Sequence, residues 1–102
     1  MSQTPTVLIT GAAGNLGAKL RRHWQDRYPL RLLDCDPRGD KSIVTADLSR
    51  WESFWLEQFQ GVDVVVHLAA DPTAQQTWPN LLAPNVDVLI NVYEAAVRAG
   101  VR

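Results

Sequence analysis

The chain is poor in cysteine and in long apolar runs, and each shortage excludes a class of protein. Its 102 residues include a single cysteine, Cys35, so no internal disulfide can form and a reducing cytoplasm is the expected compartment. No apolar run approaches the roughly 18 residues of a membrane helix, and the short polar N-terminus lacks the basic stretch of a signal peptide. We therefore expect no membrane partner and, from the length, one domain.

Net charge is also low, because ten Lys and Arg residues stand against eleven Asp and Glu residues. Proteins that bind nucleic acids usually carry a basic excess or stripe, so no nucleic-acid partner is expected. No cluster of His, Cys and Asp residues has the spacing of metal ligands, so no metal site is predicted. Apolar residues make up 46% of the chain, which is enough for a core.

Apolar runs alternate with helical patterns along the whole chain. Ser49 and Glu52 fit a capping box at the start of the second helix, and Gly61 and Gly100 are placed to end helices. The expected strands are 6–10, 30–34, 43–46 and 62–67, and the expected helices are 15–28, 49–60 and 84–99. The last helix is expected to bury Val86, Leu89, Ile90, Tyr93, Ala96 and Val97.

Strands that alternate with helices predict crossover connections, and therefore a mostly parallel sheet with helices on both faces. We expect an α/β fold of three layers, with about four strands in the order 3-2-1-4. The link over 35–42 is shorter than the dozen or so residues of an ordinary crossover. Residues 64–66 are three consecutive valines, typical of a strand buried on both faces, yet this strand lies at the sheet edge. We expect self-association or a missing C-terminal half to cover it.

A glycine-rich turn, TGAAGNLG over 10–17, joins the first strand to the first helix. Gly11 allows a tight turn, Gly14 lets the backbone approach a pyrophosphate, and Gly17 lets the helix pack close to the strand. The first amides of the helix and its dipole would attract the phosphates. The candidate phosphate-binding residues are Gly11, Ala13, Gly14, Asn15, Leu16 and Gly17.

An acidic residue, Asp34, ends the second strand 23 residues after Gly11, near the spacing of about 20 that is typical of dinucleotide sites. A carboxylate at this place can accept both hydroxyls of the adenosine ribose and would repel a 2′-phosphate. NAD is therefore the expected cofactor, and NADP is less favoured. Arg38 argues for the alternative, because a nearby arginine can accommodate that phosphate.

The glycine turn and Asp34, with three further segments, resemble the extended short-chain dehydrogenase/reductase family. The further segments are Asp47-Leu48, His67-Leu68-Ala69-Ala70 and NVDVLINVYEAAVRAGV over 85–101. The family includes NAD-dependent sugar-nucleotide epimerases and dehydratases, and uronate dehydrogenases. The resemblance spans 7–101 and implies a Rossmann-like, dinucleotide-binding domain over 1–102.

The resemblance also implies roles for single residues. Asp47 and Leu48 would lie against the adenine, with the Asp47 carboxylate bonded to the exocyclic amine. Asn85 would help to shape the active site, although the Gly-Thr that usually follows Asn-Val in the family is here Asp87-Val88. The segment expected to pass near the nicotinamide ribose is Leu68, Ala69 and Ala70.

The family's catalytic pair, a tyrosine with a lysine four residues later, has no match in this chain. Tyr28 and Tyr93 are followed at that spacing by Leu32 and Val97. We therefore predict no catalytic residue here. The chain is expected to be the NAD-binding N-terminal portion of an epimerase, dehydratase or dehydrogenase that meets a sugar or sugar nucleotide only in the complete enzyme. The alternatives are a non-catalytic dinucleotide-binding or interaction module, and a truncated gene product without activity.

Overall fold

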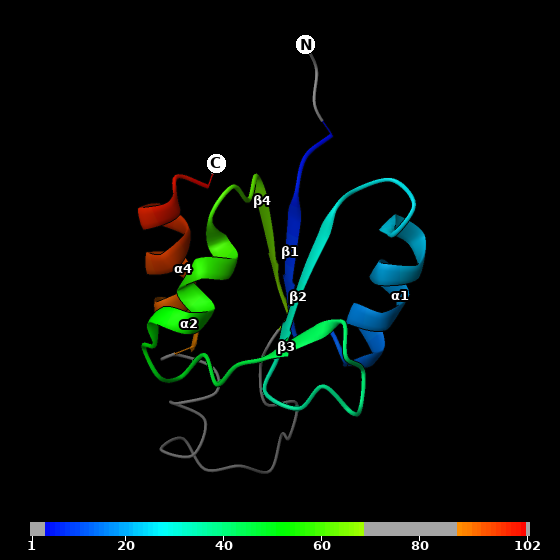
Figure 1. Cartoon of the computed structure of the whole chain (residues 1–102), viewed down its shortest axis with the longest axis horizontal. Coiled ribbons are helices and arrows are strands. Elements are labelled where there is room, and N and C mark those ends of the chain that lie inside the picture. Colours follow the sequence, from blue (N-terminus) through cyan, green and yellow to red (C-terminus); the bar gives the residue numbers. More distant parts are fainter. Residues whose placement is uncertain (1–3, 69–87, 102) are drawn as a thin grey trace.

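A four-stranded sheet runs through the centre of the molecule, with helices on both of its faces (Figure 1). The computed structural model describes residues 4–68 and 88–101. The strands are β1 (Val7–Thr10), β2 (Leu30–Asp34), β3 (Ile43–Thr45) and β4 (Val64–His67). All neighbouring pairs are parallel and the order is β3-β2-β1-β4, as the sequence predicts.

The helices divide into two layers. Helix α1 (Asn15–Trp24) covers one face of the sheet, while α2 (Ser53–Leu56) and α4 (Val88–Ala99) cover the other (Figure 1). A 3-10 turn, η1 (Glu57–Phe59), continues α2 directly. This arrangement confirms the expected three-layer, Rossmann-like α/β fold, because helices cover both faces of a parallel sheet and α1 and α2 each lie in a connection between two parallel strands.

Each face of the sheet has its own apolar core, since successive residues of a strand point to opposite faces. Ile9 and Leu32 face α1, where Leu20, Trp24 and Tyr28 pack against them. Leu8 and Leu33 face the other way. The core on that side is completed by Ala46, Leu48, Trp55, Phe59, Val62, Val88, Val92 and Ala95.

The short link between β2 and β3 joins two parallel strands without a helix. Only three residues of β3 pair with β2, so the chain has to run back along a short strand before β3 begins. Residues 35–42 are long enough for this. Arg38 and Gly39 both take the left-handed backbone conformation there, with φ of 52° and 81°. Asp40 then accepts the N–H of Ser42, which leads the chain into β3. Two left-handed residues in succession thus reverse the chain where an ordinary crossover would need a helix.

Three expectations about the elements are wrong. The second helix begins at Ser53, not Ser49. The N–H and the hydroxyl of Ser49 both donate to the Asp47 carboxylate, so Ser49 does not form a capping box. The first helix ends at Trp24, four residues before Tyr28. Strands β1, β3 and β4 are shorter than expected by one or two residues.

The expected buried face of the last helix is also wrong. The described part of α4 buries Val88, Val92 and Ala95 against β4 and η1. The helix has apolar residues on both sides, so its pattern alone does not select the buried one. Val86 lies outside the described residues, Ala96 packs at the margin of the core, and the exposed residues are Leu89, Ile90, Tyr93 and Val97.

The two phenylalanines offer a matched test of this core. Phe59 is fully buried beside Trp55, whereas Phe54 is 47% exposed on the same helical segment. Phe59→Ala should lower the free energy of unfolding by about 3–5 kcal/mol, because it leaves a cavity. Phe54→Ala should change it by about 0.5 kcal/mol or less. Urea denaturation followed by tryptophan fluorescence measures both, and equal losses would contradict this packing.

Candidate functional site

The glycine turn lies where the sequence places it, between the end of β1 and the start of α1. Gly11 has a φ of 71°, in the left-handed region that favours glycine, and the Gly14 N–H donates to the Gly11 carbonyl at 3.1 Å. Gly14 itself is extended, with φ of −74° and ψ of 173°, and caps α1. The chain therefore reverses within three residues and presents the start of the helix at the carboxyl end of the sheet.

Gly17 lets α1 approach this turn closely. A Cβ on Gly17 would lie 2.5 Å from the Gly11 carbonyl oxygen and 2.9 Å from the Ala12 Cα, which real atoms do not tolerate. At Gly14 the nearest atom would be the Gly11 oxygen at 3.4 Å, an ordinary contact. Gly17 is thus required for packing of the protein itself, whereas Gly14 has room for a methyl group.

The N-terminal end of α1 is electrostatically suited to an anion. Asn15 and Leu16 are exposed, and the first turn carries no acidic residue. The opening amides of a helix have no acceptor within the helix, and the dipole gives this end a partial positive charge. Arg21, Arg22 and His23 lie in the last turn, where cations complement the dipole.

Asp34 reaches the turn from the end of β2. Its Oδ2 accepts the Ala13 N–H at 2.9 Å, and its Oδ1 accepts the Asp36 N–H at 3.0 Å. Next to this bond, the Ala12 N–H donates to the Leu33 carbonyl at 3.2 Å. The structure therefore brings Asp34 directly to the glycine turn, as the motif spacing predicts.

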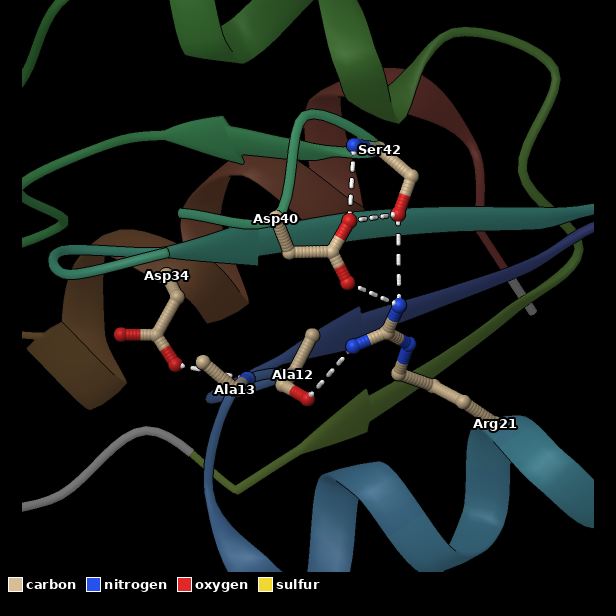
Figure 2. Close-up of polar contacts among 6 residues, drawn as sticks. All are labelled: Ala12, Ala13, Arg21, Asp34, Asp40 and Ser42. Carbon is tan, nitrogen blue, oxygen red and sulfur yellow. Dashed lines mark hydrogen bonds and ion pairs between the residues drawn. The ribbon is translucent and has the colours of Figure 1, made fainter. Parts of the chain in front are cut away.

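Three residues that sequence reasoning missed form a polar cluster beside Asp34 (Figure 2). Arg21 of α1 donates through Nη2 to Asp40 Oδ2 at 2.5 Å and to Ser42 Oγ at 3.2 Å. Its Nη1 lies 3.5 Å from the Ala12 carbonyl oxygen. Hydrogen bonds from Ser42 and then from Arg21 lower the pKa of Asp40 to about 2. No local pattern marks this cluster, because Arg21 and Asp40 are far apart in the sequence and meet only in the fold.

The predicted adenine-binding pair follows β3. Asp47 Oδ1 accepts the Ser49 N–H at 3.1 Å, and Asp47 Oδ2 lies 3.8 Å from Arg50 Nε. The side chain of Leu48 is buried in the core. The Leu48 carbonyl accepts a hydrogen bond of 2.8 Å from Asn91 Nδ2, a contact from α4 that the sequence analysis did not include.

The end of β4 is tied to the end of β1. The Leu68 N–H donates to Thr10 Oγ1 at 3.0 Å, and Thr10 Oγ1 lies 2.7 Å from His67 Nδ1. The tautomer of His67 decides which of these two atoms donates. Burial lowers the pKa of His67. Ala69, Ala70 and Asn85 lie outside the described residues.

Over 4–68 and 88–101, no helix has the length and apolar character needed to cross a membrane. Over the same ranges, no three His, Cys, Asp or Glu side chains gather closely enough to hold a metal ion.

Comparison with known proteins gives consistent matches. The model of the NAD dependent epimerase/dehydratase family matches residues 7–102. The NAD-dependent glucose-6-phosphate dehydrogenase of Haloferax volcanii is 36% identical over 93% of this chain and 39% of its own length. For the uronate dehydrogenase of Pseudomonas putida, identity is 33% over 100% of this chain and 40% of the relative. The chain thus spans about two fifths of these curated relatives.

A solved structure agrees with the sequence relatives. MoeE5 in complex with UDP-glucose and NAD superposes with a TM-score of 0.80 and 30% identity. The match covers 94% of this chain and 33% of MoeE5. The similarity therefore includes the sheet and the turn at its carboxyl end.

The tight contact at Gly17 predicts a difference between two alanine variants. Gly17→Ala should lower the free energy of unfolding by about 1–3 kcal/mol, because the new methyl group forces α1 away from Gly11. Gly14→Ala should leave stability within about 0.5 kcal/mol of the parent, since its backbone is ordinary and its Cβ has space. Chemical denaturation of both variants checks this, and a Gly17→Ala protein as stable as the parent would contradict the packing.

The half-buried His67 predicts a loss of stability in mild acid. Burial holds its folded-state pKa below 6.5, so the neutral form favours the folded protein. The stabilisation is complete above about pH 6.5, the value in an unfolded chain, and is lost as the pH falls through the lower folded-state value. Urea midpoints at pH 8 and pH 5.5 measure it. His67→Gln should reduce the difference, and an unchanged difference would assign the effect to other groups.

Proposed function

Because the chain belongs to the NAD dependent epimerase/dehydratase family, we propose that residues 1–102 form a dinucleotide-binding domain whose ligand is NAD. The observation that carries the proposal is the hydrogen bond between Asp34 and the Ala13 amide, which joins the candidate ribose-binding carboxylate to the glycine turn. A ribose and a pyrophosphate are neighbours in NAD, so their two sites must also be neighbours.

The residues at the turn fit the diphosphate of this ligand. Gly14 has no Cβ at the helix start, and the first turn of α1 offers amides without any acidic side chain. Asp34 uses one lone pair of each oxygen in its two bonds, and a carboxylate has about four, so both oxygens can still accept ribose hydroxyls. The residues proposed to hold the phosphates are Gly11, Ala13, Gly14, Asn15, Leu16 and Gly17.

The remaining contacts follow from the same orientation of the dinucleotide. We assign the adenine to the segment after β3, with Asp47 and Leu48 as its contacts. Leu68 is assigned to the nicotinamide ribose with Ala69 and Ala70, and Asn85 is assigned to the active site of the complete enzyme. NAD, when bound, supplies a nicotinamide C4 that accepts or returns a hydride.

The negative charge of Asp34 supports NAD over NADP. A 2′-phosphate would stand beside a carboxylate already held in place by two amides. Arg38 is the nearest argument for NADP in the sequence. Its N–H donates to Asp36, so the backbone at this position is fixed by the turn after β2.

For the complete enzyme, we propose hydride transfer between a sugar carbon and nicotinamide. Support comes from the names of the relatives, which are sugar dehydrogenases, and from MoeE5 with its UDP-glucose and NAD. The substrate would be a sugar or sugar nucleotide. Tyr28 and Tyr93 lack a lysine four residues later, so the part assigned to this chain is to hold the cofactor.

A second proposal concerns the side of the sheet at β4. Among the described residues this strand pairs only with β1, and Val64 is 42% exposed. Four apolar side chains of α4 are exposed nearby on the same layer. We propose that further polypeptide, or a second copy of the chain, covers this side. Sedimentation of the 102-residue protein distinguishes these two possibilities, because only the second gives a dimer.

The single, exposed Cys35 supports a reducing, cytoplasmic compartment.

Calorimetric titration with NAD tests the central proposal. The parent chain should bind NAD, and Asp34→Asn should weaken binding by about 10- to 100-fold, because hydrogen bonds to a charged acceptor are lost. Asp36→Asn is the matched control: it removes a neighbouring carboxylate that contacts only the turn, and NAD affinity should change little. A folded parent chain that binds no NAD would overturn the proposal.

A further inference from the structure

We propose that Arg21 is a positioning residue of the dinucleotide site and that Asp40, by holding and neutralising it, makes the ribose end of the site selective against a 2′-phosphate. The inference rests on the proposed NAD site and assigns its selectivity to two residues to which the family resemblance gives no role. We call the hydrogen-bonded cluster of Arg21, Asp40 and Ser42 the Arg21 clasp.

The Arg21 clasp and Asp34 hold the same dipeptide of the glycine turn (Figure 2). Asp34 accepts the N–H of Ala13, and Arg21 donates to the carbonyl of Ala12. One peptide unit is therefore held by a carboxylate on one side and a guanidinium on the other. A shift of Arg21 would move the amide that orients Asp34.

The other end of the clasp is fixed in the link between β2 and β3. Asp40 accepts Arg21 through Oδ2, while its Oδ1 accepts both the N–H and the hydroxyl of Ser42. Arg21 also donates to the Ser42 hydroxyl. Since this link begins directly after Asp34, the clasp joins α1, the glycine turn and the residues beside the proposed ribose into one unit.

The clasp also controls charge. The Arg21 side chain is only 22% exposed, and its positive charge stands next to the Ala12–Ala13 peptide that Asp34 contacts. Paired with Asp40, it contributes little net charge to a ligand nearby. Asp40 without a charge would leave Arg21 as an uncompensated cation, which attracts the two negative charges of a 2′-phosphate but acts on a ribose hydroxyl only weakly.

The test is the ratio of NADP affinity to NAD affinity, measured by calorimetry on the same preparation of each variant. Asp40→Asn should raise the ratio about three- to fivefold, and Arg21→Met should lower it by a similar factor, because Asp40 is then uncompensated. The double variant should return near the parent ratio. Glu94→Gln is the matched control, since it removes an exposed carboxylate from the Arg98 ion pair on α4.

Because both ligands are titrated into one sample, partial unfolding changes the two affinities alike and leaves their ratio unchanged. Equal effects on NAD and NADP in Asp40→Asn would overturn the selectivity role. Hydrogen exchange without ligand tests positioning separately: Arg21→Met should speed exchange of the Ala13 amide, and Glu94→Gln should not. Unchanged exchange would overturn that role. A parent chain that binds neither dinucleotide contradicts the proposed function itself, and the selectivity role with it.

Discussion

The close approach of α1 to the glycine turn is the constraint on which the rest of the site depends. At Gly17 no side chain fits between the helix and the Gly11 carbonyl, so the helix start and the strand end are fixed relative to each other. With the turn held in this way, the Ala13 amide meets Asp34. The geometry that suits a dinucleotide is therefore already present in the packing of the protein alone.

The same few residues are linked by charge as well as by packing. Asp34 and Arg21 contact adjacent residues of the turn, and Asp40 balances Arg21 from the following link. Each interaction is modest when it is exposed to water, but shared partners couple them. Asp34 and Arg21 thus meet at a single peptide unit, and Asp40 contacts Arg21 directly.

The helix α4 is packed less completely than the glycine turn, because part of its apolar surface is exposed. Val88, Val92 and Ala95 meet the core, while Leu89, Ile90, Tyr93 and Val97 are exposed. Exposed apolar patches of this kind mark surfaces where other polypeptide packs.

The sequence by itself determined the strands and helices, the glycine turn and the position of Asp34 after β2, because local periodicity and glycine spacing act over short distances. The alternation of strands and helices then predicted a parallel sheet and its order. Only the tertiary structure decided which apolar side of α4 is buried, since both sides are apolar and packing against β4 and η1 decides between them. Only the tertiary structure also showed that Ser49 donates a hydrogen bond to Asp47 and that Arg21 forms an ion pair with Asp40. These contacts depend on where the chain folds back, which no local pattern encodes.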